Sequence, residues 1–213
     1  MKICTAVAKM PFDECLNAVS TLDFVEIRLD LLELSEEEII RIFSSDCRTI
    51  ATCRPGKYAA ERRRQLLLLA ITSGASYVDI EVDADDGLKH ELIRAANAKG
   101  CQVIISFHDF EKTPQREELE RVIRRCSECH ADIIKVACMV SSPRDNARLL
   151  GLLDSDLSLL VVGMGEQGRI SRVAAPLLGG LCTFASFAAG KATAAGQMRQ
   201  QDIEELWQHF ERI

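Results

Sequence analysis

A lysine in the middle of an apolar run is the residue of this sequence that most strongly indicates chemistry. Lys135 lies in Asp132-Ile133-Ile134-Lys135-Val136-Ala137, a pattern typical of a strand that is buried on both faces. Burial disfavours the ammonium form of a lysine, so such a side chain can present a neutral amine. A neutral amine can attack a carbonyl carbon and form a Schiff base. The alternative interpretation is a structural lysine that reaches solvent or pairs with a carboxylate.

Polar side chains also gather at the ends of other strand-like runs. Glu26 and Arg28 share one face of such a run, because side chains alternate along a strand. Glu81, His108 and Lys135 lie on three consecutive strand-like runs, and neighbouring strands lie about 5 Å apart, so we expect these side chains to converge on one cavity. A histidine beside an amine can transfer protons near neutral pH. The competing interpretation of each charged pair is a structural salt bridge. The predicted inward-facing set is Glu26, Arg28, Arg54, Glu81, His108 and Lys135.

Eight strand-like runs must position these residues. They cover residues 2–7, 23–29, 48–53, 76–82, 102–107, 131–137, 158–162 and 180–184, with helical patterns between them. Strands that alternate with helices predict βαβ units and a parallel sheet. A count of eight favours an α/β fold of the (β/α)8 TIM barrel type over an open doubly wound sheet. In such a barrel the active site lies at the carboxyl ends of the strands, where the polar residues occur.

Capping signals mark several predicted helix boundaries. Ser35 and Glu38 fit a capping box. Thr113-Pro114 and Ser142-Pro143 each place a hydroxyl residue before a proline at a predicted helix start. Gly100 falls where a glycine commonly ends a helix.

The composition is that of an ordinary soluble protein. The chain has 213 residues, of which 47% are hydrophobic, and its net charge of −6 argues against a nucleic-acid partner. The apolar runs are too short to span a bilayer and no signal peptide is visible, so we predict a cytoplasmic protein with no membrane partner. Nine cysteines in such a chain are expected to be reduced thiols. Because no linker interrupts the sequence, residues 1–213 are predicted to form a single catalytic domain.

Three further motifs are interpreted as having no special function. Residues 163–168 spell GxGxxG after a strand, but the acidic residue that a dinucleotide site needs about 20 positions later is missing. Residues 126–130 spell the c-type haem attachment motif, and their single cysteine pair is weak evidence for zinc. The three arginines at residues 62–64 are interpreted as a solvated helix face, with a dimer contact as the alternative. We therefore predict no cofactor and no metal.

Taken together, these segments resemble the type I 3-dehydroquinate dehydratases, (β/α)8 enzymes of the shikimate pathway. The resemblance covers essentially the whole chain. It is carried by residues 26–30, 106–110 and 132–137, and by Gly163-Met164-Gly165 followed by Ser171-Arg172. It implies a cofactor-free lyase that converts a small-molecule substrate, 3-dehydroquinate, to 3-dehydroshikimate. Another Schiff-base barrel enzyme, such as a class I aldolase, and a non-catalytic barrel are the alternatives.

The resemblance also implies a role for each matching residue. Lys135 would form the imine with the C3 ketone, His108 would transfer protons, and Glu81 would orient His108. Arg172 would hold the substrate carboxylate, and Gln197 would belong to a loop that closes over the substrate. Further substrate contacts are expected from Glu26, Arg28, Arg54, Thr193, Met164 and Phe184. Proteins of this family are often dimers, so the resemblance also raises the expectation of a homodimer.

The closing loop departs from the pattern of many relatives. Where those read Ser-Ala-Pro-Gly-Gln, this chain has Thr193-Ala194-Ala195-Gly196-Gln197. The threonine keeps a hydroxyl group for hydrogen bonding. The missing proline is expected to leave the loop less rigid when open, because proline restricts the backbone. The small side chains of residues 188–196 suit such a lid.

Overall fold

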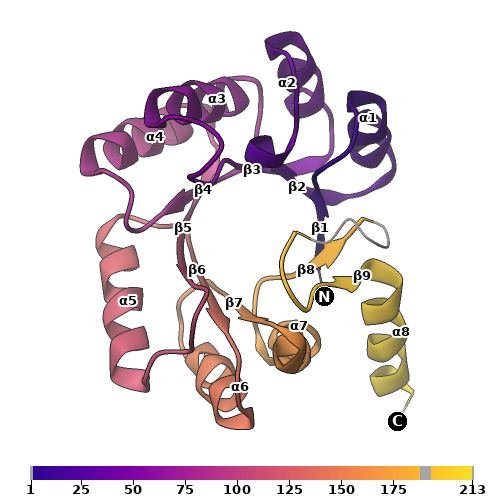
Figure 1. Cartoon of the computed structure of the whole chain (residues 1–213), viewed down its shortest axis with the longest axis vertical. Coiled ribbons are helices and arrows are strands. Elements are labelled where there is room, and N and C mark those ends of the chain that lie inside the picture. The colour runs from indigo at the N-terminus through magenta and orange to yellow at the C-terminus, as the bar shows by residue number, and fades with distance from the viewer. Residues whose placement is uncertain (1, 188–192, 213) are drawn as a thin grey trace. The chain divides into compact units, whose positions relative to one another are not determined.

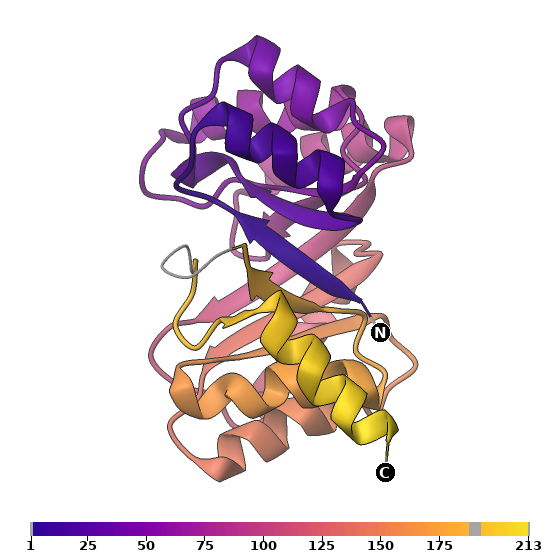
Figure 2. The same cartoon turned by 90° about the vertical axis from the view of Figure 1, so that its right-hand side faces the viewer.

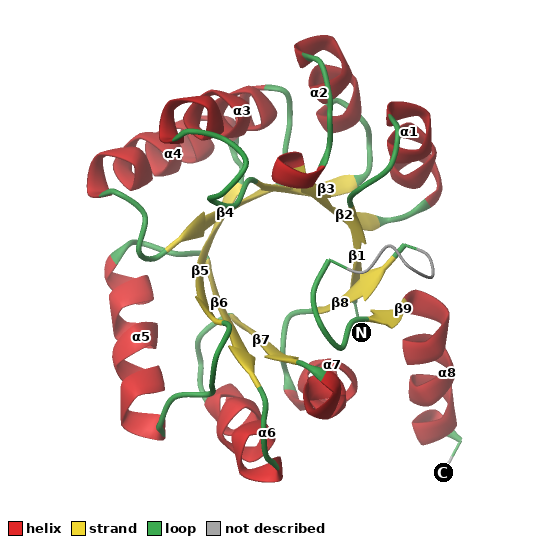
Figure 3. Ribbon diagram, viewed as in Figure 1, coloured by secondary structure: helices red, strands yellow, loops and turns green. Residues whose placement is uncertain are grey.

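The computed structural model describes residues 2–187 and 193–212, in which strands alternate with helices (Figure 1). The strands are β1 (Ile3–Val7), β2 (Phe24–Arg28), β3 (Arg48–Thr52), β4 (Tyr77–Glu81), β5 (Gln102–Asp109), β6 (Ile133–Met139), β7 (Leu159–Met164), β8 (Thr183–Ser186) and the short β9 (Met198–Arg199). The helices are α1 (Phe12–Thr21), α2 (Glu36–Phe43), α3 (Ala60–Thr72), α4 (Asp86–Lys99), α5 (Arg116–Glu128), α6 (Pro143–Leu150), α7 (Arg169–Ala174) and α8 (Gln200–Glu211). Figure 3 shows the alternation by colour, which confirms the predicted β/α order.

Residue contacts divide the chain into two compact units, which are described separately. The first unit is Thr5–Ile104, and the second is Ile105–Ile213 together with Met1–Cys4. In the first unit, β1 to β4 pair in parallel, and helices α1 to α4 cover one face of these strands (Figure 1). Their register places Arg28 opposite Thr52, and Thr52 opposite Asp79.

The second unit is built on the parallel pairs β6–β7 and β8–β9. A cluster of Ala185, Ile203 and Trp207 packs helix α8 against β8. The indole Nε1 of Trp207 donates a hydrogen bond of 2.9 Å to the Val173 carbonyl, which ties α8 to α7. Figure 2 shows α8, in yellow, beside these elements. The buried face of α8 thereby packs against β8 and against Met198 of β9.

Several predicted helix boundaries are confirmed by the observed hydrogen bonds. The backbone amide of Ser35 donates to the Glu38 carboxylate at 2.8 Å, and the Glu38 amide donates to the Ser35 hydroxyl at 3.3 Å. Helix α6 begins at Pro143, and the Asp145 carboxylate accepts a bond from the Ser142 amide at 2.9 Å. Gly100 ends α4 with a φ of 71°, a left-handed conformation that glycine adopts without strain.

Two element boundaries differ from the prediction. Helix α5 begins at Arg116 rather than at the predicted proline. The Thr113 hydroxyl instead donates a 2.6 Å hydrogen bond to the Met139 carbonyl, so it ties the loop to β6 and does not cap the helix. The eighth strand begins at Thr183, because the chain before it is still in a turn in which the Gly180 amide donates to the Ala175 carbonyl at 2.8 Å.

The arginines at residues 62–64 lie on a partly exposed helix face, and each of them also has a partner within the first unit. Arg62 pairs with Glu36 at 3.0 Å, and Arg64 pairs with Glu91 at 2.6 Å. Arg63 donates to the Cys53 carbonyl at 3.0 Å. Each of the three side chains is partly buried, because long arginine side chains can lie along neighbouring helices while their guanidinium groups meet carboxylates.

Across residues 2–187 and 193–212, no helix combines the length and apolar character that crossing a bilayer requires.

Candidate active site

Lys135 is buried in the second unit, as its apolar surroundings in the sequence predict. Its side chain on β6 is 5% exposed, and its Nζ lies over the Phe184 ring, 4.4 Å from the ring centroid. Lys135 pairs with Leu160 on β7, and Met139 pairs with Met164. Paired residues of parallel strands point to the same side, so Met164 lies on the face of Lys135, nearer the carboxyl ends of the strands. Phe184 is therefore an apolar neighbour of the Lys135 amine, and Met164 is an apolar residue on the same face of the sheet.

His108 lies near the carboxyl end of β5, one residue before the strand ends at Asp109. Its side chain is half-buried. The imidazole stacks on the ring of Phe110, with 5.8 Å between the ring centroids and 11° between the ring planes. The position at a strand end agrees with the place predicted for an acid–base residue.

Arg172 is an almost fully buried guanidinium that has no carboxylate partner in residues 2–187 or 193–212. It is 1% exposed. Its Nη1 donates to the Phe184 carbonyl at 3.3 Å, and its Nη2 donates to the Ala195 carbonyl at 3.4 Å. Its Nε meets no hydrogen-bond acceptor among these residues. Burial lowers the pKa of Arg172 to about 10, and no nearby anion opposes that effect. A buried, uncompensated cation is costly, so this arrangement is suited to an anionic ligand.

The glycines of residues 163–168 explain how Arg172 comes to be buried. The Ser171 hydroxyl accepts a bond from the Gly163 amide and donates one to the Gly168 carbonyl, both at 2.7 Å. A Cβ atom at Gly163 would lie 2.7 Å from the Ser171 oxygen, and one at Gly168 would lie 2.4 Å from the Gly163 backbone. Glycine is therefore needed for the close approach of α7 to β7. This packing accounts for the GxGxxG spacing without a dinucleotide.

Thr193 and Gln197 form a small hydrogen-bonded cluster beside β8. The Gln197 side-chain oxygen accepts bonds from the Thr193 amide at 2.7 Å and from the Thr193 hydroxyl at 3.2 Å. The Gln197 amide nitrogen donates to the Ala185 carbonyl at 3.1 Å. Between them, the Ala195 carbonyl accepts from Arg172 and, at 3.1 Å, from the Gly165 amide. The predicted lid also includes residues 188–192, which lie outside the described residues.

In the first unit, Arg54 is held by a carboxylate that sequence reasoning left out of the site. Its two terminal nitrogens donate to the Asp79 carboxylate at 2.8 and 2.6 Å, and the nearest Glu81 oxygen is 3.8 Å away. Burial alone would lower the pKa of Arg54, but attraction to Asp79 and the other nearby carboxylates raises it. Asp79 could have been identified from the sequence by its position two residues before Glu81, which puts both side chains on the same face of β4.

Arg28 has the same kind of partner. Its guanidinium donates to the Asp30 carboxylate at 3.0 and 2.6 Å, in a bidentate pair. Burial alone would lower its pKa, but the hydrogen bond to Asp30 and the charge of Glu26 raise it. Glu26 is itself buried and accepts a 3.0 Å bond from the Thr52 hydroxyl. Asp30 and Thr52 were also absent from the predicted set.

The second unit thus gathers Lys135, Arg172, Gln197, Thr193 and Phe184 around β8. The first unit gathers Glu26, Arg28, Arg54 and Glu81 on one face of β2 to β4 and the chain that follows β3. The expected approach of Glu81 to His108 and Lys135 joins residues of the two units and stays a prediction. The two arginines of the first unit are already neutralised by carboxylates, whereas Arg172 is not.

Comparison with known proteins identifies the family. A family model described as Type I 3-dehydroquinase matches residues 4–212. The chain belongs to the type I 3-dehydroquinase family. A 3-dehydroquinate dehydratase of Methanocaldococcus jannaschii is 34% identical over 193 residues, which cover 87% of this chain and 86% of that protein. Another from Methanosarcina acetivorans is 33% identical over 204 residues, which cover 86% of this chain and 84% of that protein.

Solved structures of the type I 3-dehydroquinase family support the same conclusion. The 3-dehydroquinate dehydratase of Aquifex aeolicus has a TM-score of 0.85 with 30% identity, and the match covers 100% of each chain. The predicted (β/α)8 TIM barrel fold class is confirmed. Membership in the family also confirms the predicted enzyme class, a hydro-lyase.

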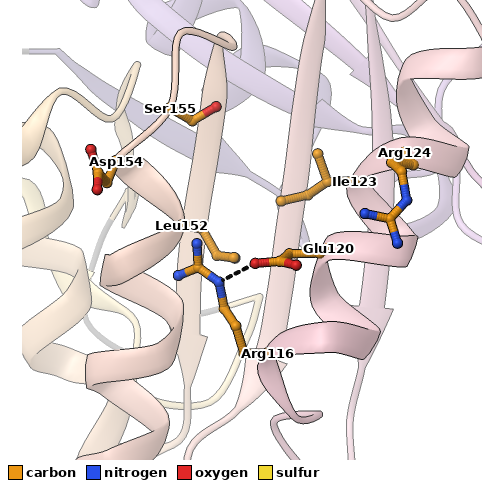
Figure 4. A pocket seen from close by; sticks show the side chains of 7 residues that line it. All are labelled: Arg116, Glu120, Ile123, Arg124, Leu152, Asp154 and Ser155. Carbon is orange, nitrogen blue, oxygen red and sulfur yellow. Dashed lines mark hydrogen bonds and ion pairs between the residues drawn. The ribbon is translucent and has the colours of Figure 1, made fainter.

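A pocket of about 180 Å³ in the second unit is lined by none of the predicted site residues (Figure 4). Its lining residues are Arg116, Glu120, Ile123, Arg124, Leu152, Asp154 and Ser155. Arg116 donates to Glu120 at 2.7 Å, so one of the two arginines is already paired within the pocket. Two cations and two carboxylates balance there, and the lining has no excess charge that would select an anion.

Proposed function

We propose that residues 1–213 act as one catalytic domain that dehydrates 3-dehydroquinate to 3-dehydroshikimate through an imine on Lys135. The observation that carries this proposal is the environment of Phe184. Its ring lies 4.4 Å from the Lys135 amine, and its carbonyl accepts a bond from Arg172. One residue therefore lies between a buried amine and a buried guanidinium that lacks a carboxylate. A substrate with a ketone and a carboxylate matches this pair.

The proposed reaction begins with attack of the Lys135 amine on the C3 carbonyl. Loss of water from the carbinolamine leaves an iminium ion. His108 then removes a proton from C2, and the electron pair moves toward the iminium nitrogen, which is a better electron sink than the ketone. The resulting enamine expels the C1 hydroxyl, which takes the proton from His108 and leaves as water. Hydrolysis of the imine by water releases the product and restores Lys135.

His108 supplies general acid–base catalysis at three points in this scheme. It moves protons during imine formation, C2 deprotonation and loss of the C1 hydroxyl. Help of this kind is worth on the order of 10² to 10⁴ in rate. The proposed role of Glu81 is to orient the imidazole of His108, as the family resemblance implies.

Arg172 fixes the substrate in the proposed complex. A guanidinium can hold a carboxylate through two parallel hydrogen bonds, and this would set the orientation of the ring. Arg28 and Arg54 offer donors whose positions are set by Asp30 and Asp79, so they are suited to orient polar groups of the substrate. The remaining proposed contacts are made by Glu26, Thr193, Gln197, Met164 and Phe184. No cofactor takes part in this scheme.

Borohydride reduction tests the covalent step. The protein is incubated with 3-dehydroquinate and borohydride, and the modified residue is located by peptide mass spectrometry. We expect the adduct on Lys135, with loss of the absorbance change that reports the conjugated enone acid. Lys135→Ala should form neither adduct nor product. Lys57→Ala is the matched control, because Lys57 is 39% exposed and should remain dispensable.

Two outcomes would contradict the proposal. An adduct on Lys57 or Lys191 would assign the amine to another lysine. Product formation by Lys135→Ala at a normal rate would exclude the imine. A homodimer and a cytoplasmic location stay predictions, which sedimentation of the purified protein and fractionation of cells can test.

A further inference from the structure

Phe110 is an exposed aromatic residue that the proposed chemistry leaves without a role. At 66% exposure it is the most exposed of the large hydrophobic side chains in residues 2–187 and 193–212. Its ring nevertheless has a defined neighbour, because it lies nearly parallel to the His108 imidazole with 5.8 Å between the centroids. Stacked aromatic pairs at such distances are favourable beyond the area that they bury.

The backbone that carries Phe110 is held at both ends of its turn. The Asp109 carboxylate accepts hydrogen bonds from the amides of Glu111 and Lys112, both at 2.9 Å. At the other end, the buried Thr113 hydroxyl donates to the Met139 carbonyl at 2.6 Å. A side-chain acceptor that bridges two amides fixes a turn, and the second bond anchors the turn to β6. Phe110 is therefore exposed to solvent, but its backbone is held in a defined position.

The stack has a physical consequence for the imidazole. The torsion that rotates a histidine ring is broad, so the ring needs neighbours to define its plane. A nearly parallel phenyl ring beside the imidazole restricts that rotation through steric contact. Proton transfer requires the imidazole nitrogen to be aligned with the reacting group, so a freely turning ring would spend less time in the productive orientation.

We propose that Phe110 is a positioning residue that holds the His108 imidazole in the plane required for proton transfer. The proposal rests on the proposed role of His108 as the acid–base residue. Phe110 itself need not contact the substrate for this function. The contribution of Phe110 comes from the aromatic stack, so loss of its ring should reduce the rate of the catalytic step by about 3- to 10-fold.

The test compares Phe110→Leu with Phe110→Tyr, which keeps the ring. We expect kcat of Phe110→Leu to fall by about 3- to 10-fold with KM within about twofold of wild type, and kcat of Phe110→Tyr to stay within about twofold. Phe210→Leu is the matched control, because Phe210 is also exposed, at 54%, and lies on α8. It should leave kcat and KM unchanged.

A double-mutant cycle separates positioning from a general structural effect. In a His108→Ala background, Phe110→Leu should cause no further loss of single-turnover rate, because the group that it positions is gone. An equal loss in both backgrounds would overturn the proposal. So would a rise in KM alone, or an unchanged kcat in Phe110→Leu. If His108→Ala itself kept a normal kcat, the proposed function would fail instead, and the two failures are thereby distinguished.

Discussion

Replacing Arg172 with methionine is predicted to stabilise the protein while it destroys substrate binding. Burial lowers the pKa of Arg172 from 12.5 to about 10. A change of that size corresponds to a penalty of about 3 kcal/mol on the charged form in the folded state. Because the folded-state pKa lies below the ordinary one, the penalty is fully present at neutral pH and is relieved only as the pH rises through about 10.

The hydrogen bonds of Arg172 offset part of that penalty. Its bonds to the carbonyls of Phe184 and Ala195 are long, at 3.3 and 3.4 Å, and contribute about 1 kcal/mol each. Methionine fills a comparable volume without charge. The net expectation for Arg172→Met is an increase of about 1 kcal/mol in the free energy of unfolding of the ligand-free protein.

Urea unfolding and steady-state kinetics measure the two effects. The variant should unfold at a higher urea concentration than wild type at pH 7, while its kcat/KM falls by about 10² or more, because a bidentate bond to a carboxylate is lost. Arg54→Met is the matched comparison and should change stability in the opposite direction. It removes the bidentate guanidinium partner of the buried Asp79 carboxylate, at a cost of about 3 kcal/mol.

The reasoning about Arg172 can be refuted in two ways. A loss of more than about 2 kcal/mol of unfolding free energy in Arg172→Met would mean that the guanidinium stabilises the fold. A kcat/KM near that of wild type would mean that Arg172 does not hold the substrate. If Arg172→Met and Arg54→Met lost equal stability, the contrast between a paired and an unpaired buried arginine would be wrong.

Three other substitutions or reagents give sharp expectations. Gly196→Ala should lower kcat/KM by at least about tenfold, because its Cβ would lie 2.0 Å from the Gly165 carbonyl, and the kinetics of Gly100→Ala, which has open space and a similar φ, provide the control. Gln197→Leu should raise KM by about tenfold, because it removes three hydrogen bonds that hold the chain beside β8; an unchanged KM in initial-rate assays would show that this cluster is dispensable. Burial raises the pKa of Cys138 to about 12, so its thiol should resist iodoacetamide at pH 8 in the native protein, as peptide mapping can check; rapid labelling of Cys138 would contradict its burial.

Local patterns predicted much of the fold, and they selected candidate site residues. A charged residue inside an apolar strand stands out from its neighbours, so Lys135, Glu26 and Glu81 could be selected without a structure. Alternation along β2 correctly placed Glu26 and Arg28 on one face, with Val25 and Ile27 buried on the other. The capping box at Ser35 was also readable, because its two partners are three residues apart.

Contacts between distant segments could not be read in this way. Thr113 was predicted to cap a helix, but it bonds to the carbonyl of Met139, which lies 26 residues away. Asp79 was placed on the right face, but its pairing with Arg54 depends on the register of β3 and β4. Hydrogen-bond partners of this kind are set by how strands align, and the local sequence does not encode that alignment.

The sequence by itself determined the residue types, their alternation along each strand and the order of the β/α elements, since these follow from periods of two or a few residues. The tertiary structure alone decided which charges are compensated. Arg54 acquired the Asp79 carboxylate, which lies 25 residues away, whereas Arg172 was buried against two carbonyls. The physical reason is that the energy of a buried charge depends on the atoms around it in space, and those atoms come from segments far apart along the chain.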